Sequence, residues 1–151
     1  MNRIYIIISG SRKLNKSFRP KLICKFLKNL LNIVGHNLTV IHGDCEYGID
    51  ALIDHYCKEL SIDRIKYPAN WGKYGRKAGW VRNNLMFAHG NPDYVICIYN
   101  SLQRKSPGTK MTEKLSNNYR IPAIITSVVD LMNNVKGVLE NSGLKEVIES
   151  R

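Results

Sequence analysis

Residues 67–86 hold the densest group of side chains that could bind a ligand. Glycines alternate in this stretch with two tryptophans, Tyr74 and four cations. Glycine lets the backbone approach a ligand closely, and aromatic rings offer faces for stacking. The planar guanidinium groups of Arg76 and Arg82 match phosphate or carboxylate. The pattern predicts a binding loop that runs into a helix; the alternative is a surface loop whose tryptophans anchor it to the core.

The charge of the chain also favours an anionic partner. The formal net charge is +11, and no acidic residue precedes Asp44, whereas arginine and lysine accumulate in that segment. A positive field attracts nucleotides and nucleic acids alike. Abundant lysine, isoleucine and asparagine would also follow from an AT-rich genome, so composition alone leaves codon bias as an alternative source of the charge.

The composition sets the class of protein to expect. A chain of 151 residues predicts one domain, residues 1–151. No apolar run approaches the about 18 residues of a membrane span, and the apolar run 4–8 is too short for a signal peptide. Four cysteines without short paired spacings indicate neither a zinc site nor a disulfide framework. We therefore expect a cytoplasmic protein with no membrane association, no metal and no cofactor.

Apolar runs alternate with amphipathic segments along the whole chain. The expected strands are residues 4–9, 38–42, 62–67, 94–99 and 123–126. Helical spacing of apolar residues follows each strand, including a helix over 78–90, another over 108–119 and a C-terminal helix from about 127. This order predicts an α/β fold: a doubly wound, mostly parallel sheet of about five strands with helices on both faces.

Two helices carry more detailed expectations. We expect the first helix to be capped by Ser17, to hold Pro20 in its first turn and to end at Gly35. The C-terminal helix should fray around residues 141–143. Its apolar positions suit either the core or an interface between two copies of the chain.

Each expected strand is followed by a loop, and these loops should meet at one edge of the sheet. Ser9, Gly10, Ser11 and Arg12 follow the first strand, and further glycine-rich loops follow the second and fourth. In doubly wound sheets, ligands bind beyond the carboxyl ends of the strands at the switch point. The loops, with residues 67–86 after the third strand, therefore predict one shared crevice.

The ordered set of loop residues resembles the YspA-like branch of the SLOG superfamily, a Rossmann-like group that includes the Lonely Guy phosphoribohydrolases and the DprA DNA-processing proteins. The match spans roughly residues 4–125. The matching residues are Ser9, Gly10, Ser11, Arg12, His42, Gly43, Gly48, Asp50, Ala51, Pro68, Ala69, Trp71, Tyr74, Gly75, Ala78, Gly79, Arg82, Asn83, Met86, Gly108, Thr109 and Met111.

The resemblance implies a pocket for a nucleotide or a nucleotide-derived signal, such as an ADP-ribose-like molecule or a cyclic nucleotide. Its expected ligand-binding residues are Ser9, Gly10, Ser11, Arg12, Gly43, Asp44, Trp71, Tyr74, Arg82, Asn83, Gly108 and Thr109. Gly108 and Thr109 would hold a phosphate at a helix N-terminus, and Trp71 or Tyr74 would stack on a base. The alternative is that Arg12 or Arg82 forms a structural ion pair with Asp44 or Asp50. Trp80 is expected to serve in packing rather than in binding.

The loop after the fourth strand departs from the pattern of the Lonely Guy enzymes. Those relatives have a Pro-Gly-Gly-x-Gly-Thr loop with a glutamate at a fixed offset, whereas here residues 106–113 lack a glycine pair and place Glu113 one position later. One residue on a helix is about 100° of rotation. The segment between Thr109 and Met111 is also one residue shorter than in the YspA-like branch.

Three functions remain open from the sequence. The first is binding of a nucleotide-derived ligand by a sensor or a sequestering protein, for example in phage counter-defence. The second is an N-glycosidase of the phosphoribohydrolase type acting on a nucleoside monophosphate, with Arg82 and Glu113 as catalytic residues. The third is DprA-like binding of single-stranded nucleic acid along the cationic first helix. Self-association into a homo-oligomer is an expectation because SLOG relatives often self-associate.

Overall fold

The computed structural model describes residues 2–100 and 107–151, and its centre is a five-stranded sheet in the order β3-β2-β1-β4-β5. The strands are β1 (Ile4–Gly10), β2 (Leu38–His42), β3 (Asp63–Lys66), β4 (Tyr94–Tyr99) and β5 (Ala123–Ser127). Every neighbouring pair is parallel. The predicted α/β fold with a doubly wound sheet is therefore confirmed.

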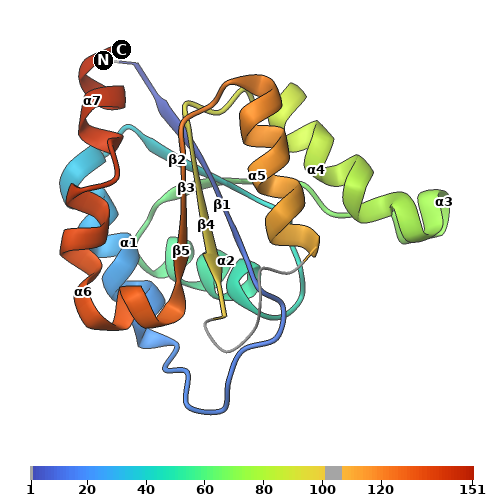
Figure 1. The fold of residues 1–151 in the computed structure, drawn as a ribbon, viewed down its shortest axis with the longest axis horizontal. Coiled ribbons are helices and arrows are strands. Elements are labelled where there is room, and N and C mark those ends of the chain that lie inside the picture. Colours follow the sequence, from blue (N-terminus) through green and yellow to red (C-terminus); the bar gives the residue numbers. More distant parts are fainter. Residues whose placement is uncertain (1, 101–106) are drawn as a thin grey trace.

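Helices cover both faces of the sheet (Figure 1). One face carries α1 (Lys21–Val34), α2 (Ile49–Glu59), α6 (Val128–Glu140) and α7 (Leu144–Glu149). The other carries α4 (Ala78–Ala88) and α5 (Pro107–Tyr119). The short helix α3 (Trp71–Tyr74) and the 3₁₀ turn η1 (Gly75–Lys77) precede α4 and project beyond the sheet.

The central strand β1 is buried on both faces, which explains its unbroken apolar sequence. Successive side chains of a strand point to opposite faces. Ile4, Ile6 and Ile8 accordingly pack into the core cluster under α1, α2 and α6, whereas Ile7 packs into the cluster under α4 and α5. A strand that separates two cores has no solvent face on which a polar residue would be tolerated.

The first helix begins later than the sequence predicts. Helix α1 starts at Lys21 with Pro20 in the N-cap position, and no side chain caps it. The predicted cap at Ser17 is wrong because proline disfavours helical backbone at the residue before it, so the helix cannot extend back through Arg19. The predicted end at Gly35 is confirmed: Gly35 has φ 81°, which a residue with a side chain rarely adopts.

The C-terminal segment forms two helices. Ser127 caps α6 by accepting a hydrogen bond at Oγ from the Asp130 amide at 3.0 Å. Leu131 and Val135 of α6 pack into the core, whereas Met132 is exposed. The apolar stripe predicted for this segment is thus mainly core. None of the helices within residues 2–100 and 107–151 has both the length and the apolar composition needed to cross a membrane.

Truncation of Ile6 should destabilise the protein strongly. Its side chain is 0% exposed on the central strand, so Ile6→Ala removes buried methyl groups and leaves a cavity. We expect the free energy of unfolding in urea to fall by about 2 to 5 kcal/mol. The matched control is Ile65→Ala on edge strand β3, where Ile65 is 39% exposed and the loss should stay below about 1 kcal/mol. Equal losses would contradict the assignment of β1 to the centre of the core.

Candidate ligand-binding site

A cavity of about 620 Å³ opens beside the carboxyl ends of β1 and β4. The chain runs from β1 to β2 and β3 on one side, and then returns to place β4 and β5 on the other. The cavity therefore lies at the switch point that the fold class predicts. The described residues that line it are Ser9, Gly10, Ser11, Arg12, Lys13, Gly43, Asp50, Trp71, Arg76, Gly79, Trp80, Arg82, Asn83, Met86, Cys97, Pro107, Gly108, Thr109, Met111 and Thr112.

The loop after β1 is fixed by close packing and hydrogen bonds to β4. A Cβ atom on Gly10 would lie 2.3 Å from the Ile98 carbonyl oxygen, so only glycine fits. The Ser11 amide donates to that same oxygen at 3.0 Å. Ser11 Oγ accepts from the Asn100 amide at 2.9 Å. The Ser11 hydroxyl, expected to contact the ligand, therefore also ties together the two strands that flank the crevice.

Asn100 is a positioning residue that the sequence analysis did not identify. It is buried at the end of β4, and its side-chain amide donates to the Lys13 carbonyl at 3.3 Å and to Asn15 Oδ1 at 3.1 Å. These bonds hold the cationic loop after β1 against the sheet. Asparagine after an apolar strand is common enough that its type alone gives no signal of this role.

Gly43 and Arg82 form the floor of the cavity. Arg82 comes from α4 and is only 8% exposed. Its Nη1 donates to the Gly43 carbonyl oxygen, and its Nε donates to Asn83 Oδ1 at 2.7 Å. Burial lowers the pKa of Arg82, and the attraction of Asp50 opposes that shift. The guanidinium is thus held in one orientation inside the protein rather than in solvent.

Asp50 lies beside this arginine and is also 8% exposed. Its Oδ2 accepts a hydrogen bond from the Cys45 amide at 3.3 Å, whereas its Oδ1 is buried and has no partner among the described residues. Burial raises the pKa of Asp50 above its ordinary value of 3.8, against the attraction of Arg82 and Arg12. A carboxyl with a perturbed pKa in a cleft is often found at functional sites. The sequence analysis included Asp50 among the residues that resemble the SLOG pattern and as an ion-pair partner, but not among the expected ligand-binding residues.

Arg12 and Arg82 converge from different elements. A Cβ atom placed on Gly79 would lie 3.9 Å from Arg12 Nη2 and 4.0 Å from Arg82 Nη2. Within the described part of the chain neither arginine forms an ion pair with a carboxylate, although Asp50 attracts both through space. The alternative that they serve as structural ion pairs is therefore wrong for these residues. Two guanidinium groups that converge in this way have the chemistry to bind an anion.

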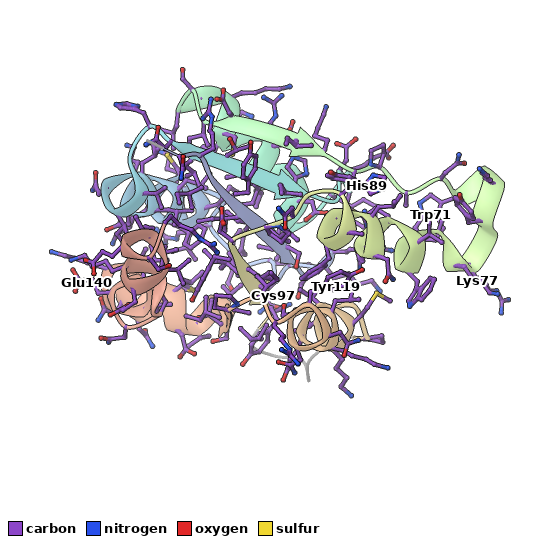
Figure 2. The ribbon with its side chains drawn as sticks, turned by 90° about the horizontal axis from the view of Figure 1, so that it is seen from above. Trp71, Lys77, His89, Cys97, Tyr119 and Glu140 are labelled. Atoms are coloured by element: carbon purple, nitrogen blue, oxygen red, sulfur yellow. The ribbon has the colours of Figure 1, made fainter. Side chains whose placement is uncertain are left out.

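Two tryptophans stand at the mouth of the cavity. Trp71 is 51% exposed and Trp80 is 55% exposed, and both line the cavity. The Arg12 guanidinium lies 5.7 Å from the centre of the Trp71 ring. Trp71 lies on the projecting segment that leads into α4 (Figure 2). The alternatives in which these tryptophans anchor a surface loop or only pack in the core are thus wrong.

The far wall of the cavity is the first turn of α5. Thr109 is buried there beside Gly108, and the Thr112 hydroxyl donates to the Gly108 carbonyl at 3.1 Å. Cys97 reaches the same wall from β4, and burial raises the pKa of its thiol. Residues 101–106, which begin the predicted glycine-threonine loop, lie outside the described residues.

Three predicted site residues are not among the described residues that line this cavity: Asp44, Tyr74 and Glu113. Tyr74 contacts its neighbour Lys73, whose Nζ lies 5.1 Å from the ring centre. Glu113 lines a separate, shallow hollow on α5 together with Lys110, Lys114, Asn117 and Asn118. The other predicted ligand-binding residues are brought together around one space.

Asp44 takes part in the support of the loop after β2. It has φ 54°, and its amide donates to His42 Nδ1 at 3.0 Å. His42 Nε2 therefore carries the proton and donates to Asp54 Oδ1 at 3.0 Å. Burial raises the pKa of Asp54, but hydrogen bonds from Arg64 and His42 outweigh this and the net shift is downward. This network fixes the turn that presents Gly43 to Arg82.

Comparison with known proteins supports the fold. No protein-family model matches the sequence, and no curated protein matches it significantly. Among solved structures, the chain is similar to the Moco carrier protein from Chlamydomonas reinhardtii, with 10% sequence identity and a TM-score of 0.58. The match covers 99% of this chain and 100% of that one. The likeness is one of fold, a Rossmann-like α/β sheet with its helices.

Substitution of two glycines in the cavity wall should have opposite effects. An added Cβ on Gly43 would lie 2.4 Å from Arg82 Nη1 and 2.9 Å from Asp50 Oδ2, whereas one on Gly79 would lie no closer than 3.7 Å to any neighbour. We expect Gly43→Ala to lower the free energy of unfolding by about 1 to 3 kcal/mol. Gly79→Ala, in helix α4, should raise it by about 0.5 to 1 kcal/mol. Chemical denaturation measures both, and a tolerated Gly43→Ala would contradict the described position of Arg82.

Asp50 should make stability depend on pH in a defined direction. Because its pKa is raised in the folded state above 3.8, the folded protein binds this proton more tightly than the unfolded chain. The carboxyl therefore destabilises the fold as pH rises from about 4 through the raised pKa. We expect Asp50→Asn to increase the free energy of unfolding relative to wild type more at neutral pH than near pH 4. Denaturation at both pH values measures this, and a difference that does not change with pH would contradict it.

Proposed function

We propose that this protein binds a phosphate-bearing, nucleotide-derived small molecule in the cavity at the end of β1 and β4. The observation that carries the proposal is the convergence of Arg12 and Arg82 beside Gly79 without a carboxylate bound to either in the described chain. The two positive charges repel each other, and a bound anion would offset this electrostatic repulsion. Phosphate matches the planar donor fork of arginine in both charge and geometry.

The rest of the cavity suits the remainder of such a ligand. A space of about 620 Å³ lies within the range of about 300 to 1,000 Å³ typical of small-molecule sites. Trp71 and Trp80 offer exposed ring faces at its mouth, where a base would stack. Gly108 and Thr109 in the first turn of α5 provide a second place where a negative group is favoured.

Binding, rather than turnover, is the role we propose. The resemblance to the YspA-like SLOG branch suggests an ADP-ribose-like or cyclic nucleotide ligand, and the neighbour of similar fold is named as a carrier. A sensor and a sequestering protein, such as a phage protein that captures a signalling nucleotide, would both need a site of this kind. We do not propose hydrolysis by Glu113, because Glu113 lines a different hollow from the two arginines.

The proposal is tested by isothermal titration calorimetry with adenine, guanine and pyrimidine mono- and diphosphates, ADP-ribose and 3′,5′-cyclic AMP. We expect at least one of them to bind, and Arg12→Ala to weaken that ligand about 10- to 100-fold because a charge-assisted hydrogen bond is lost. The matched control is Arg19→Ala, which removes an exposed arginine that does not line the cavity. It should change affinity less than about threefold.

Mass spectrometry of the bound molecule after prolonged incubation distinguishes binding from catalysis. Recovery of the intact ligand is expected, and release of a free base would contradict the proposed role. If no member of the panel binds, the proposal of a nucleotide-derived ligand is wrong. If Arg12→Ala and Arg19→Ala weaken binding equally, the general positive field rather than the cavity is responsible.

A further inference from the structure

The buried carboxylate oxygen Asp50 Oδ1 is one of two buried side-chain polar atoms of the described residues that lack a hydrogen-bond partner, the other being Ser9 Oγ. Asp50 is 8% exposed, lines the cavity, and within the described part of the chain no donor reaches this oxygen. A buried acceptor without a donor is costly to a folded protein, and such atoms are rare in native structures. Asp50 therefore has capacity for a hydrogen bond that the described chain does not supply.

None of the neighbouring donors in the described chain bonds to Oδ1. The Cys45 amide donates to Oδ2, the other oxygen of the same carboxyl group. Arg82 directs Nη1 to the Gly43 carbonyl and Nε to Asn83. Arg12 extends over the Trp71 ring. Asp50 thus lies beside Arg82 without an ion pair to it, and Oδ1 has no partner among the described residues.

The surroundings of Asp50 select the kind of donor that would meet it. A cationic amine is disfavoured because the Arg12 and Arg82 guanidinium groups converge in the same cavity. A phosphate oxygen has no proton to donate near neutral pH and would be repelled by a carboxylate. A neutral donor remains, and a hydroxyl fits a buried carboxylate oxygen well.

The position of Asp50 indicates which part of a nucleotide carries that hydroxyl. A Cβ atom added to Gly43 would lie 2.4 Å from Arg82 Nη1 and 2.9 Å from Asp50 Oδ2. The carboxyl group of Asp50 therefore lies next to the guanidinium of Arg82, which belongs to the proposed anion site. The tryptophans that offer stacking faces are at the exposed mouth. In a nucleotide the sugar lies between phosphate and base. Asp50 lies next to the proposed phosphate site and is buried, whereas the tryptophan rings are exposed. In a nucleotide bound in this way, the sugar would be the part nearest to Asp50.

We propose that Asp50 determines specificity by accepting a hydrogen bond at Oδ1 from a ribose hydroxyl of the ligand, so that the cavity prefers ribonucleotides to deoxyribonucleotides. This inference rests on the proposed binding of a nucleotide-derived ligand. It gives Asp50 a role in recognition that is separate from the attraction of phosphate by Arg12 and Arg82. A site built around a buried acceptor discriminates against ligands that lack the donor, because the acceptor is then left buried and unpaired.

The test compares ADP with 2′-deoxy-ADP and 3′-deoxy-ADP by isothermal titration calorimetry. Wild-type protein should bind ADP about tenfold or more tightly than at least one deoxy analogue. In Asp50→Ala this preference should shrink to less than about threefold, because the ribose hydroxyl then has lost its acceptor. Asp50→Asn, which keeps the shape of the side chain but removes its charge, should fall between wild type and Asp50→Ala.

The outcomes separate this inference from the proposed function. If wild type binds ADP and both analogues equally, Asp50 does not recognise a ribose hydroxyl, although nucleotide binding stands. If Asp50→Ala keeps the full preference, another group reads the hydroxyl and the inference is wrong. If none of the three molecules binds, the inference about Asp50 is wrong. Titration with the other nucleotides named for the proposed function then shows whether the proposal of nucleotide binding is wrong as well. Circular dichroism of each variant establishes that it is folded.

Discussion

Arg82 is held inside the protein by the carbonyl oxygen of Gly43, and the geometry of the cavity depends on that contact. A buried guanidinium is tolerated only when its donors are satisfied. Here the Gly43 carbonyl and Asn83 satisfy two of its nitrogen atoms, while Nη2 remains directed toward Gly79 and the cavity. Any side chain on Gly43 would occupy the space of the guanidinium itself. The absence of a Cβ atom on Gly43, directly after β2, thus determines where the guanidinium of Arg82 on α4 can lie.

The fold explains why such distant residues meet. Arg12 and Gly43 lie in the connections that follow β1 and β2, and Arg82 lies in α4, the helix that follows β3. Parallel strands bring all such connections to one edge of the sheet. The bond between Ser11 Oγ and the Asn100 amide then fixes the spacing between β1 and β4. The hydrophobic core positions the strands, and a small number of polar contacts position the loops.

The sequence predicted the strands well because they are encoded locally, and most of the predicted site residues line one cavity. Tyr94–Tyr99 is a short apolar run that is typical of a buried strand. Gly10 and Arg12 stand at the end of another such run, and Arg82 stands in the helical segment that precedes β4. The start of α1 was misplaced because the restriction that Pro20 imposes on its neighbour outweighs the capping tendency of Ser17.

The sequence could not show how side chains on different helices and strands are oriented relative to one another. Whether Asp50 pairs with Arg82 or faces a cavity depends on distances of a few ångströms between α2 and α4, which no local pattern fixes. The same holds for Glu113, which follows the cavity-lining Thr112 by one residue and is therefore rotated from it by about 100° around α5. The exposure of Trp80 could not be predicted either. The residues around it in the sequence suit a buried ring and an exposed ring equally well.

The two tryptophans at the cavity mouth are the only ones in the chain. The protein therefore carries its own optical reporter: any indole emission comes from the rim of the cavity and from no other part of the molecule. A base that stacks on either ring would quench that emission, whereas changes elsewhere in the fold would leave it nearly unaltered. Occupancy of the site could then be followed in real time in the unlabelled, unmodified protein, and the rate of ligand capture becomes as accessible as its affinity.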